Sequence, residues 1–242
     1  MDLIFGRSRR PKAITNVPGR APIELVDCYD EFLWYYPQCE LATKKWFVDH
    51  VREDWCILDV GANIGYYAIL FSQLAPQGHV YAIEPDATSL QKLQRNLKHH
   101  EVRNVTVLNY AVGKSTGMIE DDIYNLWGTP PTRKSYPFIT VDALVKEKAL
   151  SRVDAIKIDV DSFDFDVLQG AQETLIQYNP YVVVELNHAL NLRNESNAKA
   201  IRWMAGLGYT DAVVLDYDNF AFKRGADPGQ SAASITLHFP PD

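Results

Sequence analysis

Short runs of Val, Ile and Leu alternate with amphipathic segments along most of the chain, and this alternation limits the folds it can adopt. The apolar runs lie at 57–60, 80–84, 105–108, 156–160, 181–186, 213–215 and 235–239. Helices are expected between them, for example at 87–99, 166–178 and 198–207. Strands that are apolar at successive positions are typical of a parallel sheet covered on both faces. The pattern therefore predicts an α/β fold with a seven-stranded, mostly parallel sheet flanked by helices.

Three stretches fall outside this alternation. Residues 1–20 carry five basic side chains, two prolines and two glycines, and we expect a flexible basic arm there. Residues 21–54 precede the first strand and contain a helical run, which predicts an N-terminal helical cap. The main domain would then span 55–242 and include an inserted loop at 113–137. A loop of that length is typical of a functional or disordered segment.

The net charge of −7 argues against binding to nucleic acid, because the phosphate backbone would repel most of the surface. No apolar run approaches the ~20 residues of a membrane span. The cysteines Cys28, Cys39 and Cys56 have no metal-ligand spacing, and three thiols cannot all pair within the chain. Reduced thiols are typical of the cytoplasm. We therefore expect a cytoplasmic protein without nucleic-acid or membrane partners.

The segment LDVGANIG at 58–65 places a glycine turn between the first apolar run and a helical segment. Its spacing differs from the G-x-G-x-x-G turn that receives a pyrophosphate. The carboxylate of Asp59 would repel a pyrophosphate, whereas it suits a ligand with a cationic end. Gly61 would let the backbone approach that ligand, and Gly65 would let the helix pack close to the strand. A tight turn with a purely structural aspartate is the alternative.

Glu84 ends the second apolar run, close to the ~20-residue offset at which an acid binds ribose hydroxyls in nucleotide-binding folds. Pro85 follows it and stiffens the turn. A single acid at a strand end is a weak signal. Together with the glycine turn, however, Glu84 predicts a site for a nucleoside.

An ordered set of motifs covers residues 35–186. The motif DVGANIG is followed by AIEP, NVTVLNYAVG, IKIDV, VLQGA and VVVEL. In this order the motifs resemble the FkbM family of methyltransferases. The resemblance implies a Rossmann-like class I methyltransferase fold and S-adenosylmethionine as the methyl donor. It also implies O-methylation of a hydroxyl on a small molecule or sugar, with no requirement for a metal.

The resemblance assigns residues to the donor. Asp59, Gly61 and Asn63 would line its methionine end. Glu84 would hold the ribose, and Asn109 and Ala111 would flank the adenine. The full set expected to bind the donor is Asp59, Gly61, Ala62, Asn63, Glu84, Pro85, Asn109, Ala111 and Asp159.

The sequence departs from the family after IKIDV, where members continue with Glu-Gly and this chain has Asp161-Ser162. The acid is one methylene shorter and the glycine is lost, so we expect a different turn. Asp159 and Asp161 alternate at the end of a predicted strand and would point to one face. Asp159 would hold the donor's amino group or the acceptor. Two alternatives stay open: with Asn187 the acids could bind Mg²⁺, or they could cap the following helix.

Among the six histidines, His188 is the one on the predicted ligand-binding edge of the sheet. An imidazole titrates near neutrality, so His188 or Asp161 would take the proton of the acceptor hydroxyl. The expected catalytic residues are Asp159, Asp161 and His188. The aromatic run at 34–36 is typical of a core, although it could also cover a sulfonium.

The expected partner is a small-molecule or sugar acceptor, and a homodimer is possible. The loop at 113–137 would form a lid over that acceptor, with Trp127, Arg133 and Tyr136 covering it. A structural flap is the alternative. An N-methyltransferase or protein methyltransferase on the same fold is a rival function, and so is a non-catalytic domain that binds S-adenosylmethionine. The absence of G-x-G-x-x-G argues against a nucleotide-dependent oxidoreductase.

Overall fold

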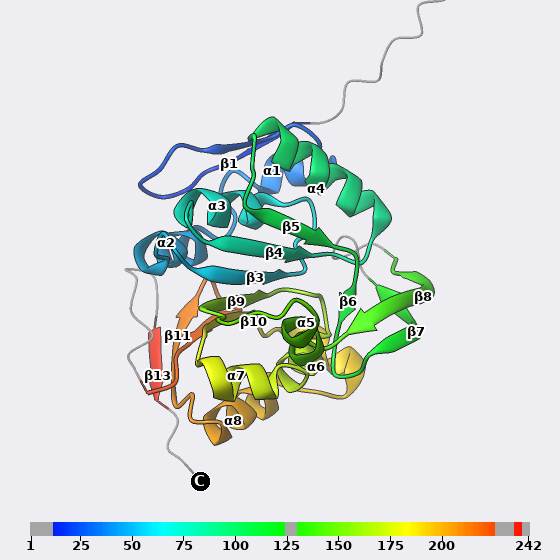
Figure 1. The fold of residues 1–242 in the computed structure, drawn as a ribbon, viewed down its shortest axis with the longest axis vertical. Helices are drawn as coiled ribbons and strands as arrows, with labels where there is room; N and C mark the ends of the chain where they lie inside the picture. The colour runs from blue at the N-terminus through cyan, green and yellow to red at the C-terminus, as the bar shows by residue number, and fades with distance from the viewer. Residues whose placement is uncertain (1–11, 124–129, 226–234, 239–242) are drawn as a thin grey trace, which may run out of the picture.

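An eight-stranded sheet forms the centre of the computed structural model, which describes residues 12–123, 130–225 and 235–238 (Figure 1). Its strand order is β13-β11-β12-β10-β9-β3-β4-β5. The strands are β3 (Cys56–Val60), β4 (His79–Ile83), β5 (Val105–Leu108), β9 (Ala155–Ile158), β10 (Tyr181–Glu185), β11 (Asp211–Leu215), β12 (Asn219–Phe222) and β13 (Ile235–His238). The predicted α/β class with a mostly parallel sheet is confirmed.

The closing strands of the sheet differ from the prediction in one respect. The segment Asn219–Phe222 forms β12, which pairs antiparallel with both β10 and β11. This strand was missed, because the short stretch NFAF follows a turn and shows no clear alternation. The seven predicted strands correspond to β3, β4, β5, β9, β10, β11 and β13, and β12 is the additional strand, which lies between β10 and β11.

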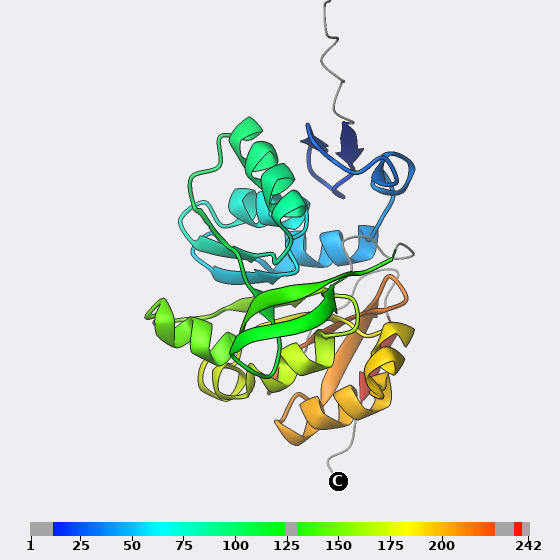
Figure 2. The ribbon, with the colours of Figure 1, turned by 90° about the vertical axis from the view of Figure 1, so that its right-hand side faces the viewer.

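Helices cover both faces of the sheet, as Figures 1 and 2 show. One apolar core packs under α2 (Leu41–His50), α3 (Tyr66–Leu74) and α4 (Ala87–His99). The other packs under α5 (Val141–Glu147), α6 (Asp164–Gln169), α7 (Gln172–Tyr178) and α8 (Asn197–Gly206). Alternation along β3 explains this division, since Ile57 packs in the first core while Leu58 and Val60 pack in the second.

The helix predicted at 166–178 is in fact two helices, α6 and α7. They meet at Gly170, where a Cβ atom would lie 2.2 Å from the carbonyl oxygen of Gly113. The chain therefore turns where another backbone passes close by. The helix predicted at 87–99 is confirmed, and its N-cap Asp86 accepts hydrogen bonds from the amides of Thr88 and Ser89.

The N-terminal region is more ordered than the arm predicted for 1–20. Ala13–Thr15 forms β1, which pairs with β2 (Ile23–Leu25), and both strands bury side chains in the core under α3. The predicted boundary at residue 20 is thus wrong, because apolar side chains on alternating positions anchor this stretch; residues 1–11 lie outside the described part. The predicted cap contains α1 (Phe32–Tyr35) and α2, together with β2.

The insertion at 113–137 is a β-hairpin in the described part, not an irregular loop. β7 (Gly117–Ile123) pairs with β8 (Thr132–Ile139), and β8 also pairs with β6 (Ala111–Val112). This hairpin stands at the side of the molecule toward which the arrows of β3, β4 and β5 point (Figure 1). Pro137 lies within β8, opposite Met118 of β7.

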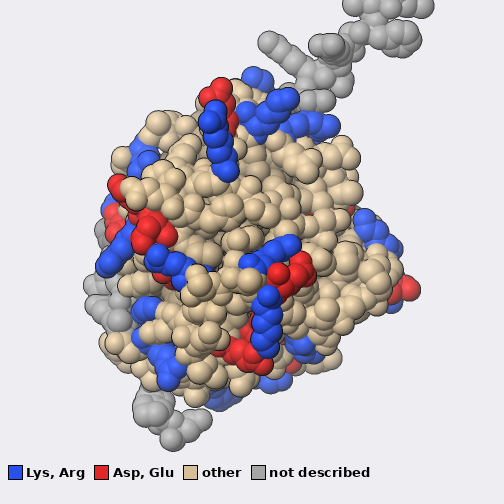
Figure 3. All heavy atoms as spheres, in the orientation of Figure 1, with Lys and Arg blue, Asp and Glu red and all other residues tan. Residues whose placement is uncertain are grey.

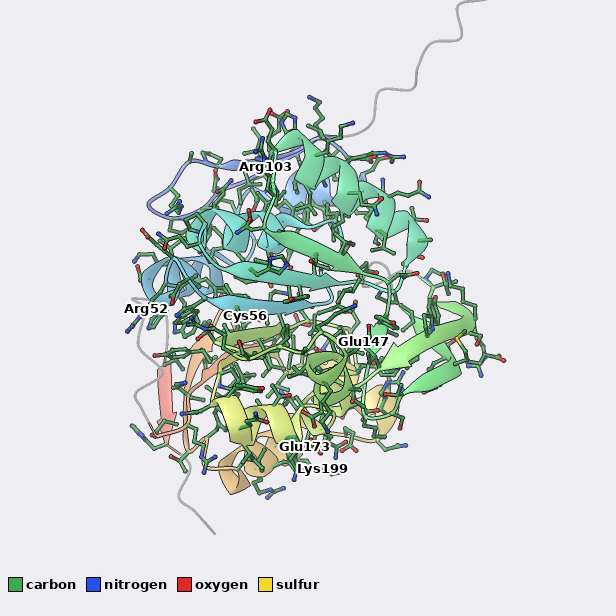
Figure 4. All side chains as sticks on the ribbon, in the orientation of Figure 1. Arg52, Cys56, Arg103, Glu147, Glu173 and Lys199 are labelled. Carbon is green, nitrogen blue, oxygen red and sulfur yellow. The ribbon has the colours of Figure 1, made fainter. Side chains whose placement is uncertain are left out.

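All three cysteines are free and buried, and Cys56 lies at the start of β3 (Figure 4). The face in Figure 3 carries interspersed acidic and basic side chains. Across the described residues, no helix has the length and apolar character that a membrane span requires.

Candidate active site

A cavity of about 660 Å³ lies at the carboxyl ends of β3, β4, β9 and β10, within the size range of small-molecule sites. It is the place where open α/β sheets bind ligands. The predicted site residues that line it are Asp59, Gly61, Ala62, Asn63, Glu84, Pro85, Ala111, Asp159, Asp161 and His188. The structure therefore brings together every predicted site residue except Asn109.

The two glycines of the turn have different structural tasks. Gly61 has a φ of +82°, and a Cβ atom there would lie 1.8 Å from the carbonyl oxygen of Asp159. The neighbouring strand end, rather than the ligand, is what excludes a side chain at Gly61. Gly65 has a φ of +91° at the N-cap of α3, where a Cβ atom would meet Leu93 of α4 at 3.0 Å. The predicted close packing at Gly65 is thus against a helix, not the strand.

Asp59 is fully buried and faces the cavity from β3. Neither of its carboxyl oxygens has a hydrogen-bond partner among the described residues. Burial raises the pKa of Asp59 to about 6, although the nearby Lys157 opposes this. A buried carboxyl without partners is costly unless a ligand completes it.

Lys157 is a site residue that the sequence reasoning missed. It lies in β9 in register with Asp59, is 2% exposed, and donates from Nζ to Asp159 Oδ2 at 2.9 Å. The same ammonium lies 4.6 Å from the centre of the Tyr67 ring of α3. Burial alone would lower the pKa of Lys157, but Asp159 and Asp59 outweigh it and raise the pKa. The signal available was a lysine alternating with isoleucines in IKI.

Glu84 is 7% exposed, so it is more enclosed than the open strand end that its position suggested. Its Oε2 accepts from the amide of Asn63 at 2.9 Å, and its Oε1 accepts from the amide of Asp86 at 2.8 Å. Burial raises the pKa of Glu84 to about 7 despite these bonds. Each oxygen retains a second lone pair, with which it can accept a further hydrogen bond from a hydroxyl.

Asn109 is exposed and does not line the cavity. Its side-chain amide donates to the carbonyl oxygens of Glu84 and Pro85 at 3.1 and 2.9 Å. It thereby ties the end of β5 to the turn after β4, and supports that turn from outside. The next residue, Tyr110, lines the cavity together with Ala111.

The Asp161–Ser162 turn after β9 has an uncommon backbone conformation. Both residues have left-handed backbones, with φ of 47° and 87°. Burial first, and then Asp159, raises the pKa of Asp161 to about 8. The N-cap of α6 is Phe163 and has no side-chain cap, so the capping alternative is wrong for both acids. Asp159 and Asp161 nevertheless face the same cavity.

Further acids enclose the remainder of the cavity. Glu40, which precedes α2, accepts from the hydroxyl of Tyr66, and Glu185 Oε2 accepts from the side chain of Asn187 at 2.8 Å. Burial raises the pKa of both glutamates, and Asp159 raises it further. Among the described residues no three His, Cys, Asp or Glu side chains converge as a metal site would require. The magnesium alternative includes the amide oxygen of Asn187 beside Asp159 and Asp161, all three of which line the cavity, and it stays a prediction.

The opening of the cavity is aromatic. Trp34 is 79% exposed on α1 beside the half-exposed Tyr35, whereas Tyr36 is buried; all three line the cavity. The run therefore combines the core and site roles considered from sequence. His188 is exposed at the start of the 3₁₀ helix η1 (His188–Arg193). Tyr136, expected to cover the acceptor, is instead buried in the hairpin and donates to the Thr132 carbonyl oxygen, while Trp127 lies outside the described residues.

Solved structures with a similar arrangement include a methyltransferase and a protein in complex with AdoMet. Methyltransferase FkbM from Methylobacillus flagellatus KT aligns with a TM-score of 0.54 at 17% identity, over 71% of this chain and 44% of that one. This chain thus spans less than half of that protein. The TYW2 protein of M. jannaschii, solved in complex with AdoMet, aligns with a TM-score of 0.52 at 15% identity, over 92% and 90% of the two chains. The fold is that of the class I methyltransferases.

Sequence comparison identifies the family. The profile of the methyltransferase FkbM domain matches residues 59–210. Hexuronic acid methyltransferase AglP of Haloferax volcanii is 30% identical over 186 residues, which cover 74% of this chain and 75% of that protein. Methyltransferase 1 of Beauveria bassiana is 24% identical over 205 residues, covering 69% and 82%. The chain belongs to the FkbM methyltransferase family, as the resemblance of its motifs predicted, and it is a methyltransferase.

Proposed function

We propose that this methyltransferase uses S-adenosylmethionine as its donor and methylates a hydroxyl group of a small molecule or sugar. The observation that carries the donor assignment is the buried Asp59, which lines the same cavity as Glu84 and whose two carboxyl oxygens have no hydrogen-bond partner among the described residues. A ligand with an ammonium group at one end and ribose hydroxyls in the middle would supply partners to both acids. The fit is chemical as well as spatial.

The residues of the chain would divide the donor between them. Asp59 and the turn at 61–63 would receive the amino-acid end, and Glu84 would accept hydrogen bonds from the ribose. Ala111 and Tyr110 would flank the base. Once bound, the donor supplies an electrophilic methyl group, so the protein's task is to orient the two reactants and exclude water.

The acceptor would enter past Trp34 and Tyr35, whose rings can stack on the apolar face of a sugar. Asp161 is our candidate for the group that receives the hydroxyl proton when the acceptor oxygen bonds to the methyl carbon. Its pKa of about 8 is close to neutrality, which is favourable for a general base. His188 is the second candidate and lies at the exposed edge of the same cavity.

The acidic lining of the cavity disfavours a negatively charged acceptor. Its acidic lining is Glu31, Glu40, Asp59, Glu84, Asp159, Asp161, Glu185 and Asp218. The one lysine in that lining, Lys157, is already paired with Asp159. The name of the relative AglP points to a sugar acid as acceptor in that protein. In this chain a carboxylate on the acceptor would lie among the acidic side chains of the lining, so we infer that the acceptor is uncharged and offers a hydroxyl.

Two measurements test this proposal. S-adenosylmethionine and its demethylated product should raise the melting temperature while NAD should not, with about 2.7 kcal/mol of stabilisation at a hundredfold excess over Kd. Transfer of labelled methyl should then be compared among glucose, glucuronic acid and glucosamine glycosides and in a host extract. A stabilising effect of NAD alone would refute the donor. Transfer to glucuronic acid only would refute the neutral acceptor.

A further inference from the structure

Arg193 joins three segments that are far apart in the sequence. It ends η1, and its Nε donates to Ser162 Oγ at 3.2 Å in the turn after β9. Its terminal nitrogens donate to Asp121 of β7 at 3.0 and 3.3 Å. The guanidinium also lies over the ring of Phe163, 3.1 Å from its centre. A single planar cation therefore contacts both the inserted hairpin and the turn.

These contacts are sheltered from solvent, so they are more than an exposed ion pair. The side chains of Arg193 and Asp121 are 21% and 28% exposed, and Ser162 and Phe163 are buried. Burial would raise the pKa of Asp121, but its hydrogen bonds with Arg193 outweigh this and lower it. Charge-assisted bonds to a guanidinium fork fix direction as well as distance.

The turn is a place where such support is needed. Asp161 and Ser162 both have left-handed backbones, and Ser162, with a φ of 87°, occupies a conformation that favours glycine. Here the serine hydroxyl accepts a hydrogen bond from Arg193, which a glycine could not do. Ser162 is therefore less favourable than glycine in this backbone conformation, but its hydroxyl also forms the hydrogen bond that holds the turn to Arg193.

All three joined segments reach the cavity. Ile123 enters it from β7, Asp161 and Phe163 from the turn, and His188 from the start of η1. Because Arg193 itself does not line the cavity, its influence must pass through these neighbours. We propose that Arg193 is a positioning residue that couples the β7–β8 hairpin to the Asp161–Phe163 turn and so fixes Asp161 in the acceptor side of the cavity. The catalytic consequence rests on the proposed function; the coupling does not.

Hydrogen exchange tests the coupling without any acceptor. The reporters are the amides of β7 and the amide of Val160, which donates to Asp164 Oδ1 across the turn at 3.0 Å. We expect Asp121→Ala, a change in the hairpin, to speed exchange at Val160 roughly tenfold, as local opening would. Arg193→Ala should speed exchange in both segments. Arg193→Lys should speed exchange in both segments to a smaller extent. This variant replaces Arg193→Ala in the test if the alanine variant does not fold.

Arg133→Ala is the matched control, because Arg133 bonds Glu120 and Asp122 on either side of Asp121 yet is 60% exposed and makes no contact with the turn among those described. It should leave exchange at Val160 within twofold of wild type, the range of local change without coupling. Equal effects of Asp121→Ala and Arg133→Ala at Val160 would overturn the coupling, as would the absence of any effect of Arg193→Lys and Arg193→Ala there.

Kinetics test the positioning of Asp161, with the glycoside that gives the fastest transfer in the panel above. Arg193→Ala should lower kcat about 10- to 100-fold, as expected for a displaced catalytic group, with donor Kd changed less than threefold. Adding Ser162→Gly should restore at least roughly threefold of the loss, because glycine adopts the turn without the bond. An unchanged kcat, or no rescue, would overturn the positioning role. If methyl is transferred neither to a glycoside nor in the host extract, the proposed function fails, while hydrogen exchange still decides the coupling.

Discussion

The two halves of the cavity are built in different ways. The donor half consists of short continuous stretches at the ends of β3 and β4, in which Glu84 bonds the backbone amides of Asn63 and Asp86. The acceptor half is assembled from α1, the turn after β9, the hairpin and η1, joined by side chains such as Arg193. The first half is a property of local sequence, whereas the second exists only once the whole chain has folded.

The acidic side chains of the two halves also differ in whether they already have hydrogen-bond partners. In the donor half, Asp59 is buried with both oxygens unpartnered. In the acceptor half, Glu40 and Glu185 already accept hydrogen bonds from Tyr66 and Asn187. A ligand would therefore complete the donor half, while it would have to compete with existing bonds in the acceptor half. From this difference we expect tight binding in the donor half and adjustable recognition in the acceptor half.

Lys157→Met should cause the largest loss of stability, because Lys157 is the buried cation that interacts with both Asp59 and Asp159. It would leave Asp59 and Asp159 without the buried cation between them. Removing one partner of a buried pair costs about 3–5 kcal/mol of unfolding free energy, which chemical denaturation would measure. The exposed Lys114→Met, which loses only the contact with Asp166, should cost at most about 1 kcal/mol. The loss for Lys157→Met should shrink at pH 5, because the pKa of Asp59 is raised to about 6 and its carboxyl is then mostly neutral. Equal losses for both lysines would contradict this role.

Gly61→Ala tests whether the donor half depends on backbone contact. The new Cβ would clash with the Asp159 carbonyl oxygen and would sit at a φ of +82°. We expect a loss of roughly 2–4 kcal/mol in stability, measured by denaturation, together with weaker donor binding. Gly206→Ala in α8 is the control, since nothing lies within 4 Å there, and it should stabilise by about 0.5–1 kcal/mol. A Gly61→Ala variant as stable as wild type would show that the strand ends can separate freely.

The contrast between a half built from local sequence and a half built by tertiary packing explains which site residues could be predicted from the sequence. Asp59, Gly61 and Glu84 were found because the fold places them by local rules: a strand, a turn and a fixed offset. Lys157 was missed because a charged residue inside an apolar strand is only informative once its partner Asp159 is seen to share its face. Arg193 gave no signal, because its contacts are set by tertiary packing. The hairpin and β12 were missed for a related reason, since strand pairing and not propensity defines them.

Glu84→Ala separates the halves by function. It should weaken donor binding by about 1.5–3 kcal/mol, the usual value for a hydrogen bond to a charged group, as titration calorimetry would show. It also frees the amides of Asn63 and Asp86, so the turn should loosen. Acceptor KM at saturating donor should change little. If calorimetry finds the affinity unchanged in a folded Glu84→Ala variant, the ribose assignment is wrong.

The acids of the cavity predict how stability varies with pH. The pKa of Asp59 is raised to about 6, that of Glu84 to about 7 and that of Asp161 to about 8. The folded protein thus holds protons that the unfolded chain has released, so the free energy of unfolding falls as pH rises from about 4 to 8. We expect a fall of at least about 1.4 kcal/mol, the equivalent of one pKa unit, by denaturation at pH 5 and pH 8. S-adenosylmethionine carries a positive sulfonium, so it should reduce this fall more than its demethylated product, whose sulfur is uncharged. A free energy of unfolding that rises with pH would contradict the pKa shifts.

Trp34→Ala should have the smallest effect, and it isolates the acceptor half. Trp34 is 79% exposed, so its loss should leave the melting temperature almost unchanged, yet it lines the opening of the cavity. An aromatic ring stacked on an acceptor contributes about 0.5–1.5 kcal/mol, which corresponds to a rise in acceptor KM of roughly two- to tenfold. Donor affinity should stay the same, because Asp59 and Glu84 lie deeper in the cavity lining, on β3 and directly after β4.

Tyr217→Ala is the matched control: Tyr217 is 95% exposed but does not line the cavity, and its loss should not change KM. If both variants raise KM equally, Trp34 is an ordinary exposed aromatic; if Trp34→Ala weakens the donor instead, the boundary between the two halves lies nearer the opening than we infer.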